Sequence, residues 1–254
     1  MEISRIKSMK GYQAITCLTA YDFNMGKLLE ESNVDVILVG DSVGNVVYGF
    51  ESTQDVTMYM MVRHTEAVRR GAFTSTIIAD MPYQSDETGE KALENAKKLV
   101  AAGADAVKVE GKPEIVKYLV DHEVFVMGHV GLLPQTASEM KVQGKDGASA
   151  NRIIEQAKAL EKAGAFAVVL ETIPASLADT ITKLISIPTI GIGAGPHCDG
   201  QVLVSNDMLG MYEELSPKFV KRYGNCNDDI RKAVTQYVKE VKAGEFPGEE
   251  HSFS

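Results

Sequence analysis

Short apolar runs alternate with longer segments of helical period along most of the chain. Most of the runs lack the polar alternation of a strand that has one face in water. They therefore predict strands that are buried on both faces, as parallel strands are. The predicted strands cover residues 15–18, 34–39, 74–79, 104–109, 124–127, 165–170, 187–192 and 201–204.

The segments between the runs place apolar side chains on one face of a helix. Ala92, Ala96 and Leu99, for example, are spaced so that they share one face. Gly103 and Gly164 follow two of these segments at the position where a left-handed C-terminal cap is favoured. We therefore predict helices that pack against the strands and end before these glycines.

An internal repeat supports this interpretation. Residues 95–110 and 156–171 are identical at 9 of 16 positions without a gap, and they lie 61 residues apart. This distance corresponds to two strand–helix units of roughly thirty residues each. Repeated units of one barrel explain the repeat better than shared turn chemistry does.

Eight strands with helices between them, in a chain of 254 residues, predict an α/β fold of the (β/α)8 TIM-barrel type. An open, doubly wound sheet is the main alternative. No long linker or shift in composition divides the chain, so we predict a single domain over residues 1–254. We expect residues 228–242 to form a closing amphipathic helix and residues 244–254 to form a polar tail.

Charge and composition narrow the class of protein. The chain has 26 Lys and Arg residues against 35 Asp and Glu residues, a formal net charge of −9, which counts against nucleic acid or an anionic membrane as the main partner. No apolar run approaches the roughly 18 residues of a membrane span, and the first residues lack the apolar stretch of a signal peptide. The three cysteines are scattered, without the paired spacing of a metal site. We expect a cytoplasmic protein with reduced thiols.

Ionisable side chains stand at the ends of five consecutive predicted strands. In a barrel, the carboxyl ends of the strands converge on one face, and active sites are built there. A lone acidic residue after a strand is often only a helix cap, but five strands in succession indicate a shared site. The predicted site residues are Asp41, Ser42, Asp80, Lys108, Glu110, His129 and Glu171.

Three of these carboxylates predict a metal ion. Asp41, Asp80 and Glu110 would crowd negative charge at one end of the barrel unless a cation offsets it. Oxygen ligands with no Cys or His among them favour Mg²⁺ over zinc. The alternative is a cluster of salt bridges around Lys108.

Glu171 is our candidate for the general base. It follows the strand two units beyond Glu110, so we expect it to face the same end of the barrel without binding the metal. The alternative is that Glu171 caps the helix that starts after Pro174.

The order of the motifs identifies a family. The chain resembles the ketopantoate hydroxymethyltransferases, the first committed enzymes of pantothenate synthesis, from about residue 5 to residue 247. The matching stretches are long and ordered, so the resemblance is far more specific than a single glycine pattern. They read LTAYDF (18–23), VDVILVGDSVGNVVYG (34–49), HTEAVRRG (64–71), IIADMPY (77–83), AVKVEG (106–111), GHVGLLPQ (128–135), KVQG (141–144), IPTIGIGAG (187–195) and CDGQVLV (198–204).

The resemblance implies a fold, a reaction and a set of roles. Members are (β/α)8 barrels that bind Mg²⁺ and transfer a hydroxymethyl group from 5,10-methylenetetrahydrofolate to 3-methyl-2-oxobutanoate, through an enolate that the metal stabilises. The product is 2-dehydropantoate. By motif, the metal ligands are Asp41, Asp80 and Glu110, the residues around the substrate are Asp41, Ser42, Asp80, Lys108 and His129, and the proton acceptor is Glu171.

The chain departs from the family pattern mainly in its loops. Residues 138–140 read Ser-Glu-Met where the family usually has Gly-Gly-aromatic. Two alternative functions stay open: a Mg²⁺-dependent oxo-acid lyase or mutase of the isocitrate lyase or phosphoenolpyruvate mutase type, and a non-catalytic barrel that binds a small molecule. The resemblance also implies a homo-oligomer, commonly a decamer.

Overall fold

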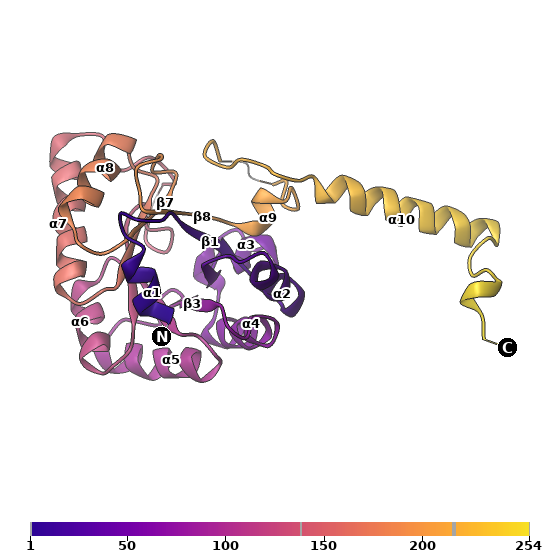
Figure 1. Ribbon diagram of the computed structural model, residues 1–254, viewed down its shortest axis with the longest axis horizontal. Coiled ribbons are helices and arrows are strands. Elements are labelled where there is room, and N and C mark those ends of the chain that lie inside the picture. The colour runs from indigo at the N-terminus through magenta and orange to yellow at the C-terminus, as the bar shows by residue number, and fades with distance from the viewer. Residues whose placement is uncertain (1, 138, 215–216, 254) are drawn as a thin grey trace. The chain divides into compact units, whose positions relative to one another are not determined.

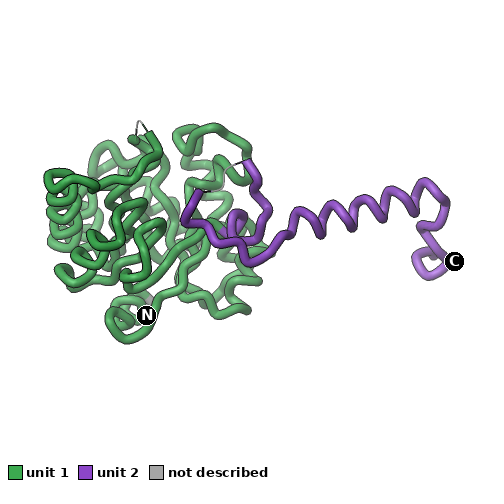
Figure 2. Tube along the Cα trace, turned by 90° about the horizontal axis from the view of Figure 1, so that it is seen from above, with its two compact units in different colours: residues 1–204 green, residues 205–254 purple. Residues whose placement is uncertain are grey.

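The computed structural model describes residues 2–137, 139–214 and 217–253. By compactness the chain divides into two units, Met1–Val204 and Ser205–Ser254, which Figure 2 shows in different colours. Each unit is described by itself. The single domain over residues 1–254 stays a prediction.

The first unit is a closed barrel of eight parallel strands. Each strand pairs with its neighbour in sequence, and β1 closes the barrel against β8, with Cys17 opposite Val202. The closed barrel confirms the predicted fold and excludes the open sheet. The strands are β1 (Ile15–Thr19), β2 (Val36–Val39), β3 (Thr76–Asp80), β4 (Ala106–Glu110), β5 (Val126–Gly131), β6 (Ala167–Glu171), β7 (Thr189–Ile192) and β8 (Gly200–Leu203).

Helices surround the strands, as Figure 1 shows for α4 to α8. Gly103 and Gly164 follow α5 and α7 with φ of +112° and +99°, which confirms the predicted left-handed positions. The helices of this unit are α1 (Glu2–Ser8), α2 (Phe23–Glu31), α3 (Val43–Val46), η1 (Thr53–Asp55), α4 (Met58–Gly71), α5 (Gly89–Ala101), α6 (Pro113–Asp121), α7 (Gly147–Lys162) and α8 (Ala175–Leu184).

An apolar plug fills the end of the barrel where the strands begin. Ile3, Ile6 and Met9, in and just after α1, belong to the same buried cluster as the inward-facing side chains of the strands. Arg5 binds Asp35, just before β2, with 2.9 Å between Nη1 and Oδ1. Because this end is closed, the chemistry of the barrel is confined to the opposite end, which we call the barrel mouth.

The second unit contains α9 (Ser205–Met208), α10 (Cys226–Ala243) and η2 (Glu249–His251). The predicted helix over 228–242 lies within α10, none of whose residues is buried. Gly244 ends α10 in a left-handed conformation, with φ of +72°. No helix in the described part of the chain is both long and apolar enough to cross a membrane.

Candidate active site

The strands bring the predicted residues together at the barrel mouth. Side chains two residues apart on a strand share a face, so Lys108 and Glu110 of β4 point the same way. The strand register places Asp80 of β3 beside Lys108 and His129 of β5 beside Glu110. Glu171 of β6 pairs with Gly131 at the end of β5. Residues at the ends of four neighbouring strands, β3 to β6, therefore lie together at the barrel mouth.

Asp41, Asp80 and Lys108 form the first group of this site. The main-chain N–H of Asp41 donates to Oδ2 of Asp80 at 3.0 Å. Nζ of Lys108 lies 3.1 Å from Oδ1 of Asp80, and all three residues are buried. The predicted alternative, an ion pair on Lys108, is therefore one part of this site.

The first group carries strong electrostatic strain. Burial, and after it the charge of Asp80, raises the pKa of the Asp41 carboxyl. Burial by itself would lower the pKa of Lys108, but the charges of Asp80, Glu110 and Asp41 raise it above its ordinary value. Lys108 is thus a fixed cation, and one cation does not offset the surrounding carboxylates.

His129 joins two further carboxylates into a second group. Its Nδ1 lies 3.5 Å from Oε1 of Glu110, and its Nε2 lies 3.2 Å from Oε2 of Glu171. Burial and the charge of Lys108 lower the pKa of His129, but the two carboxylates outweigh them and raise it to about 9. The raised pKa favours the protonated ring, which would lie as a cation between the carboxylates of Glu110 and Glu171.

The alternative role of Glu171 as a helix cap is wrong. Helix α8 starts after Pro174, and no side chain caps its first turn. The Glu171 side chain is 16% exposed, against 5% for Glu110, so Glu171 is the more open of the two carboxylates beside His129.

Gln135 is a site residue that the sequence analysis missed. Its Nε2 donates to Oδ2 of Asp41 at 2.8 Å and to the carbonyl of Met81 at 2.9 Å. Its main-chain N–H donates to Oε2 of Glu110 at 3.3 Å. The only sequence signal for this buried amide is its place at the end of GHVGLLPQ, the stretch that contains His129.

Tyr21 is a second residue that was missed. It follows β1, is buried, and its hydroxyl lies 2.8 Å from Oγ of Ser42. Ser42 precedes α3 but makes no capping hydrogen bond there. The Ser42 hydroxyl is thus positioned by Tyr21 and does not cap the start of the helix.

The protein side chains at this site could supply only some of the ligands that a Mg²⁺ ion needs. Within the described residues, no three or more Asp, Glu, His and Cys side chains are grouped closely enough to hold a metal by themselves. Mg²⁺ usually takes one or two carboxylates and completes its shell with water and substrate. Asp41 and Asp80 fit that pattern, because burial and then the charge of Asp80 raise the Asp41 pKa, and a dication beside the two carboxylates would relieve their repulsion. Water or a bound small molecule would have to supply the remaining ligands.

The cysteines show no sign of reactive chemistry. All three are free, and burial raises the pKa of Cys17 and of Cys198, the latter to about 11. A thiol that resists ionisation is a poor nucleophile and a poor metal ligand.

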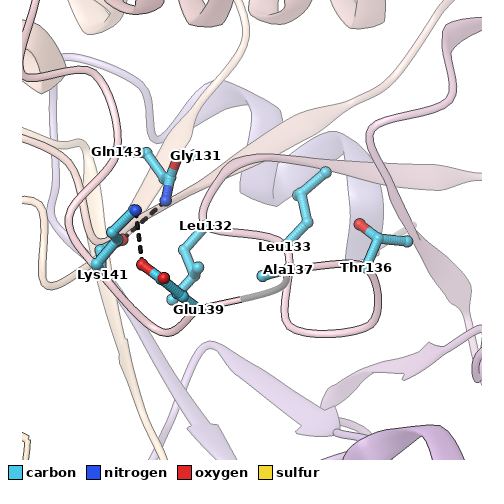
Figure 3. A pocket seen from close by; sticks show the side chains of 8 residues that line it. All are labelled: Gly131, Leu132, Leu133, Thr136, Ala137, Glu139, Lys141 and Gln143. Atoms are coloured by element: carbon cyan, nitrogen blue, oxygen red, sulfur yellow. Dashed lines mark hydrogen bonds and ion pairs between the residues drawn. The ribbon is translucent and has the colours of Figure 1, made fainter.

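A pocket of about 310 Å³ opens beside the ends of β5 and β6. Figure 3 shows its lining residues, which come from the last residue of β5 and the segment that follows it. They are Gly131, Leu132, Leu133, Thr136, Ala137, Glu139, Lys141 and Gln143. Ser138, in the segment where the chain departs from the family pattern, lies outside the described residues.

Comparison with known proteins gives a family and close relatives. A family model described as ketopantoate hydroxymethyltransferase matches residues 1–249. A 3-methyl-2-oxobutanoate hydroxymethyltransferase of Syntrophus aciditrophicus is 54% identical, over 98% of this chain and 95% of its own length. One from Clostridium acetobutylicum is 51% identical, over 95% of this chain and 90% of its own.

Solved structures share the fold at low sequence identity. A phosphonopyruvate hydrolase complex with oxalate and Mg²⁺ has a TM-score of 0.65 at 14% identity, over 100% of this chain and 92% of the other. A 2,3-dimethylmalate lyase of the PEP mutase/isocitrate lyase superfamily has a TM-score of 0.63 at 12% identity, over 100% and 92%. These likenesses concern the fold alone.

Proposed function

Because the chain belongs to the ketopantoate hydroxymethyltransferase family, we propose that the seven predicted residues at the barrel mouth perform the reaction of that family. The activity is transfer of a hydroxymethyl group to 3-methyl-2-oxobutanoate in pantothenate biosynthesis, with methylenetetrahydrofolate as the cosubstrate. The observation that carries the proposal is the meeting, at one end of the barrel, of a buried lysine with Asp41 and Asp80 and of a histidine with Glu110 and Glu171.

The first group binds the oxo acid. We propose that the charge of Lys108 and the hydroxyl of Ser42 bind the substrate carboxylate; the raised pKa of Lys108 and the contact of Ser42 with Tyr21 support these roles. Asp41 and Asp80 would hold Mg²⁺, with Glu110 in its shell directly or through water. When bound there, Mg²⁺ supplies Lewis-acid stabilisation of the negative charge that develops on the oxo acid, worth several kcal/mol.

The second group moves the proton. Glu171 accepts the proton from C3 of the oxo acid, and the electron pair of the broken C–H bond stays on the substrate. His129 keeps the carboxylate of Glu171 oriented through the 3.2 Å contact. Water releases the one-carbon unit: both C–N bonds of methylenetetrahydrofolate break, its two nitrogens take the hydrogens of the water to give tetrahydrofolate, and the oxygen stays on the carbon. C3 forms its new bond to this carbon, and the oxygen takes the proton from Glu171 to complete the hydroxymethyl group.

The close relatives favour this reaction over the alternative functions. Sequence identities of 51% and 54% extend over nearly the whole chain. The hydrolase and the lyase share only the barrel, at 14% and 12% identity. All the carboxylates assigned to the reaction are present, which disfavours a barrel that only binds a small molecule.

An omission assay tests the proposed function. Formation of 2-dehydropantoate is followed with 3-methyl-2-oxobutanoate, methylenetetrahydrofolate and Mg²⁺, and each is left out in turn after removal of metal with a chelator. We expect product only in the complete mixture. Turnover of an oxo acid without folate would support the lyase or mutase alternative. Full activity without any divalent cation would show that the reaction needs no metal ion.

Two further properties belong to this proposal. We expect a cytoplasmic homo-oligomer, commonly a decamer in the family. An apolar stripe on α10 supports an assembly, since Ile230, Val234, Tyr237 and Val241 are all exposed. Light scattering on the purified full-length chain would give the number of subunits, and a monomer at micromolar concentration would contradict it.

A further inference from the structure

The pocket lined by eight residues between Gly131 and Gln143 lies beside the end of β6, the strand that carries the proposed base. Gly131 is the strand partner of Glu171, and the main-chain N–H of Leu132 donates to the Glu171 carbonyl at 2.9 Å. Farther along the same segment, the N–H of Gln143 donates to the carbonyl of Thr172 at 2.9 Å. The segment is therefore fastened to the end of β6 at two points, with the pocket between them.

We propose that this pocket binds the bicyclic pterin ring of the folate cosubstrate. The inference rests on the proposed function, which requires a one-carbon donor beside the carbon that Glu171 deprotonates. In methylenetetrahydrofolate the reactive carbon bridges N5 of the ring system and N10 of the tail. A ring bound next to Glu171 therefore brings the reactive carbon to the substrate and leaves the tail pointing to solvent.

The size of the pocket limits what it holds. Its volume of about 310 Å³ is at the lower end of the roughly 300–1,000 Å³ typical of small-molecule sites. That is room for a bicyclic ring but not for a whole folate. The tail, which carries the carboxylates of the glutamate, must lie outside.

The lining residues match both the apolar face and the hydrogen-bonding edge of a pterin ring. Leu132, Leu133 and Ala137 offer apolar surface to a ring face. Glu139 offers a carboxylate, which pairs well with the adjacent 2-amino and ring N–H donors of a pterin edge. Figure 3 shows Glu139 on the same side of the pocket as Lys141 and Gln143.

Glu139 is available to a ligand. Its present partner is Lys141, 2.6 Å away, and the two side chains are 65% and 66% exposed. An exposed ion pair of this kind contributes little to stability, so the carboxylate can exchange it for ring donors at small cost.

The same turn connects the pocket to the metal carboxylates. Leu133, Thr136 and Ala137 line the pocket, and the N–H groups of Thr136 and Ala137 both donate to the Leu133 carbonyl. Gln135, in the middle of this turn, contacts Asp41 and Glu110 instead. Cosubstrate and oxo acid would thus be bound by two sides of one turn.

The test fills the pocket and measures folate binding apart from proton removal. Ala137→Trp places a large side chain in the pocket, and Ala148→Trp, at an exposed position in the first turn of α7, is the matched control. Binding of 5-formyltetrahydrofolate, a stable analogue, is measured by calorimetry in the presence of Mg²⁺ and the oxo acid. Exchange of the C3 hydrogen of the oxo acid in D₂O is measured without folate.

We expect Ala137→Trp to weaken folate binding at least tenfold and to exchange the C3 hydrogen within about threefold of the parent. The control should match the parent in both. Glu139→Gln should weaken folate binding by about 10-fold to 100-fold, because a charge-assisted contact is lost.

The outcomes separate this inference from the proposed function. Parental folate affinity in folded Ala137→Trp would overturn the pocket assignment while leaving the function intact. If Ala137→Trp does not fold, the exposed substitution Glu139→Gln decides, and parental affinity there overturns the assignment as well. Absence of folate-dependent product in the parent itself would instead refute the proposed function.

Discussion

Gln135 donates its side-chain N–H groups to Asp41 and to the carbonyl of Met81, and its main-chain N–H to Glu110. The residue is buried, so these contacts are not exchanged with water. Because the Gln135 amide binds Oδ2 of Asp41, the other carboxylate oxygen, Oδ1, is held in a defined direction. At the scale of single residues, Gln135 is therefore a positioning residue for two of the proposed metal ligands.

Gln135→Met tests this role, because Met has a similar volume and no donor. We expect Mg²⁺ affinity, titrated by calorimetry with the oxo acid present, to fall by about 10-fold to 100-fold. The free energy of unfolding should fall by about 1–3 kcal/mol, since the buried Met81 carbonyl loses a partner. Gln201→Met, at an exposed position on β8, is the control. Equal Mg²⁺ affinity in the two variants would show that Gln135 has no part in the metal site.

The sequence identifies the strand-end residues of the site but not the loop residues. Lys108, Glu110 and Glu171 could be predicted because parallel strands align their carboxyl ends and alternate their faces. Gln135 and Tyr21 could not, because each lies in a connection whose path has no period. Their contacts appear only when the loop is folded back over the barrel mouth.

At the scale of the elements, α1 is a helix that is too short to be predicted from the period of its apolar residues. Seven residues make about two turns, too few to establish a pattern, and we predicted no element there. In the structure its apolar side chains complete the buried cluster inside the barrel. The predicted strands, by contrast, are all present. Some apolar runs start two residues early, as Val34 does before β2, because the chain already packs where it enters the barrel.

Ile6→Ala measures what this helix contributes. The side chain is fully buried, so we expect the free energy of unfolding, from urea titration, to fall by about 2–4 kcal/mol. Mg²⁺ affinity should stay within about twofold of the parent, because the plug and the mouth are at opposite ends of the barrel. Lys7→Ala, exposed on the same helix, should change stability by no more than about 0.5 kcal/mol. A comparable loss of unfolding free energy in both variants would contradict the proposed contribution of the buried Ile6 side chain.

At the scale of the whole molecule, the closed barrel makes one site from distant segments of sequence. Asp41 and Glu171 are 130 positions apart in the chain, yet both stand at the barrel mouth. The number of strands predicted this closure, but the pairing of β1 with β8 has no local signal in the sequence. The internal repeat is likewise explained, because its two copies cover the end of a helix and the following strand, β4 or β6.

The central claim is that Glu171 removes the C3 proton of the oxo acid before the one-carbon unit is transferred. Proton NMR of 3-methyl-2-oxobutanoate in D₂O, with Mg²⁺ and without folate, measures this step as loss of the methine signal. We predict exchange by the parent protein and a decrease of about 10²–10⁴-fold in Glu171→Gln, which keeps the shape of the side chain and removes its basicity. Affinity for the oxo acid should change little. Exchange at the parental rate in Glu171→Gln would contradict the account and assign the base to another group.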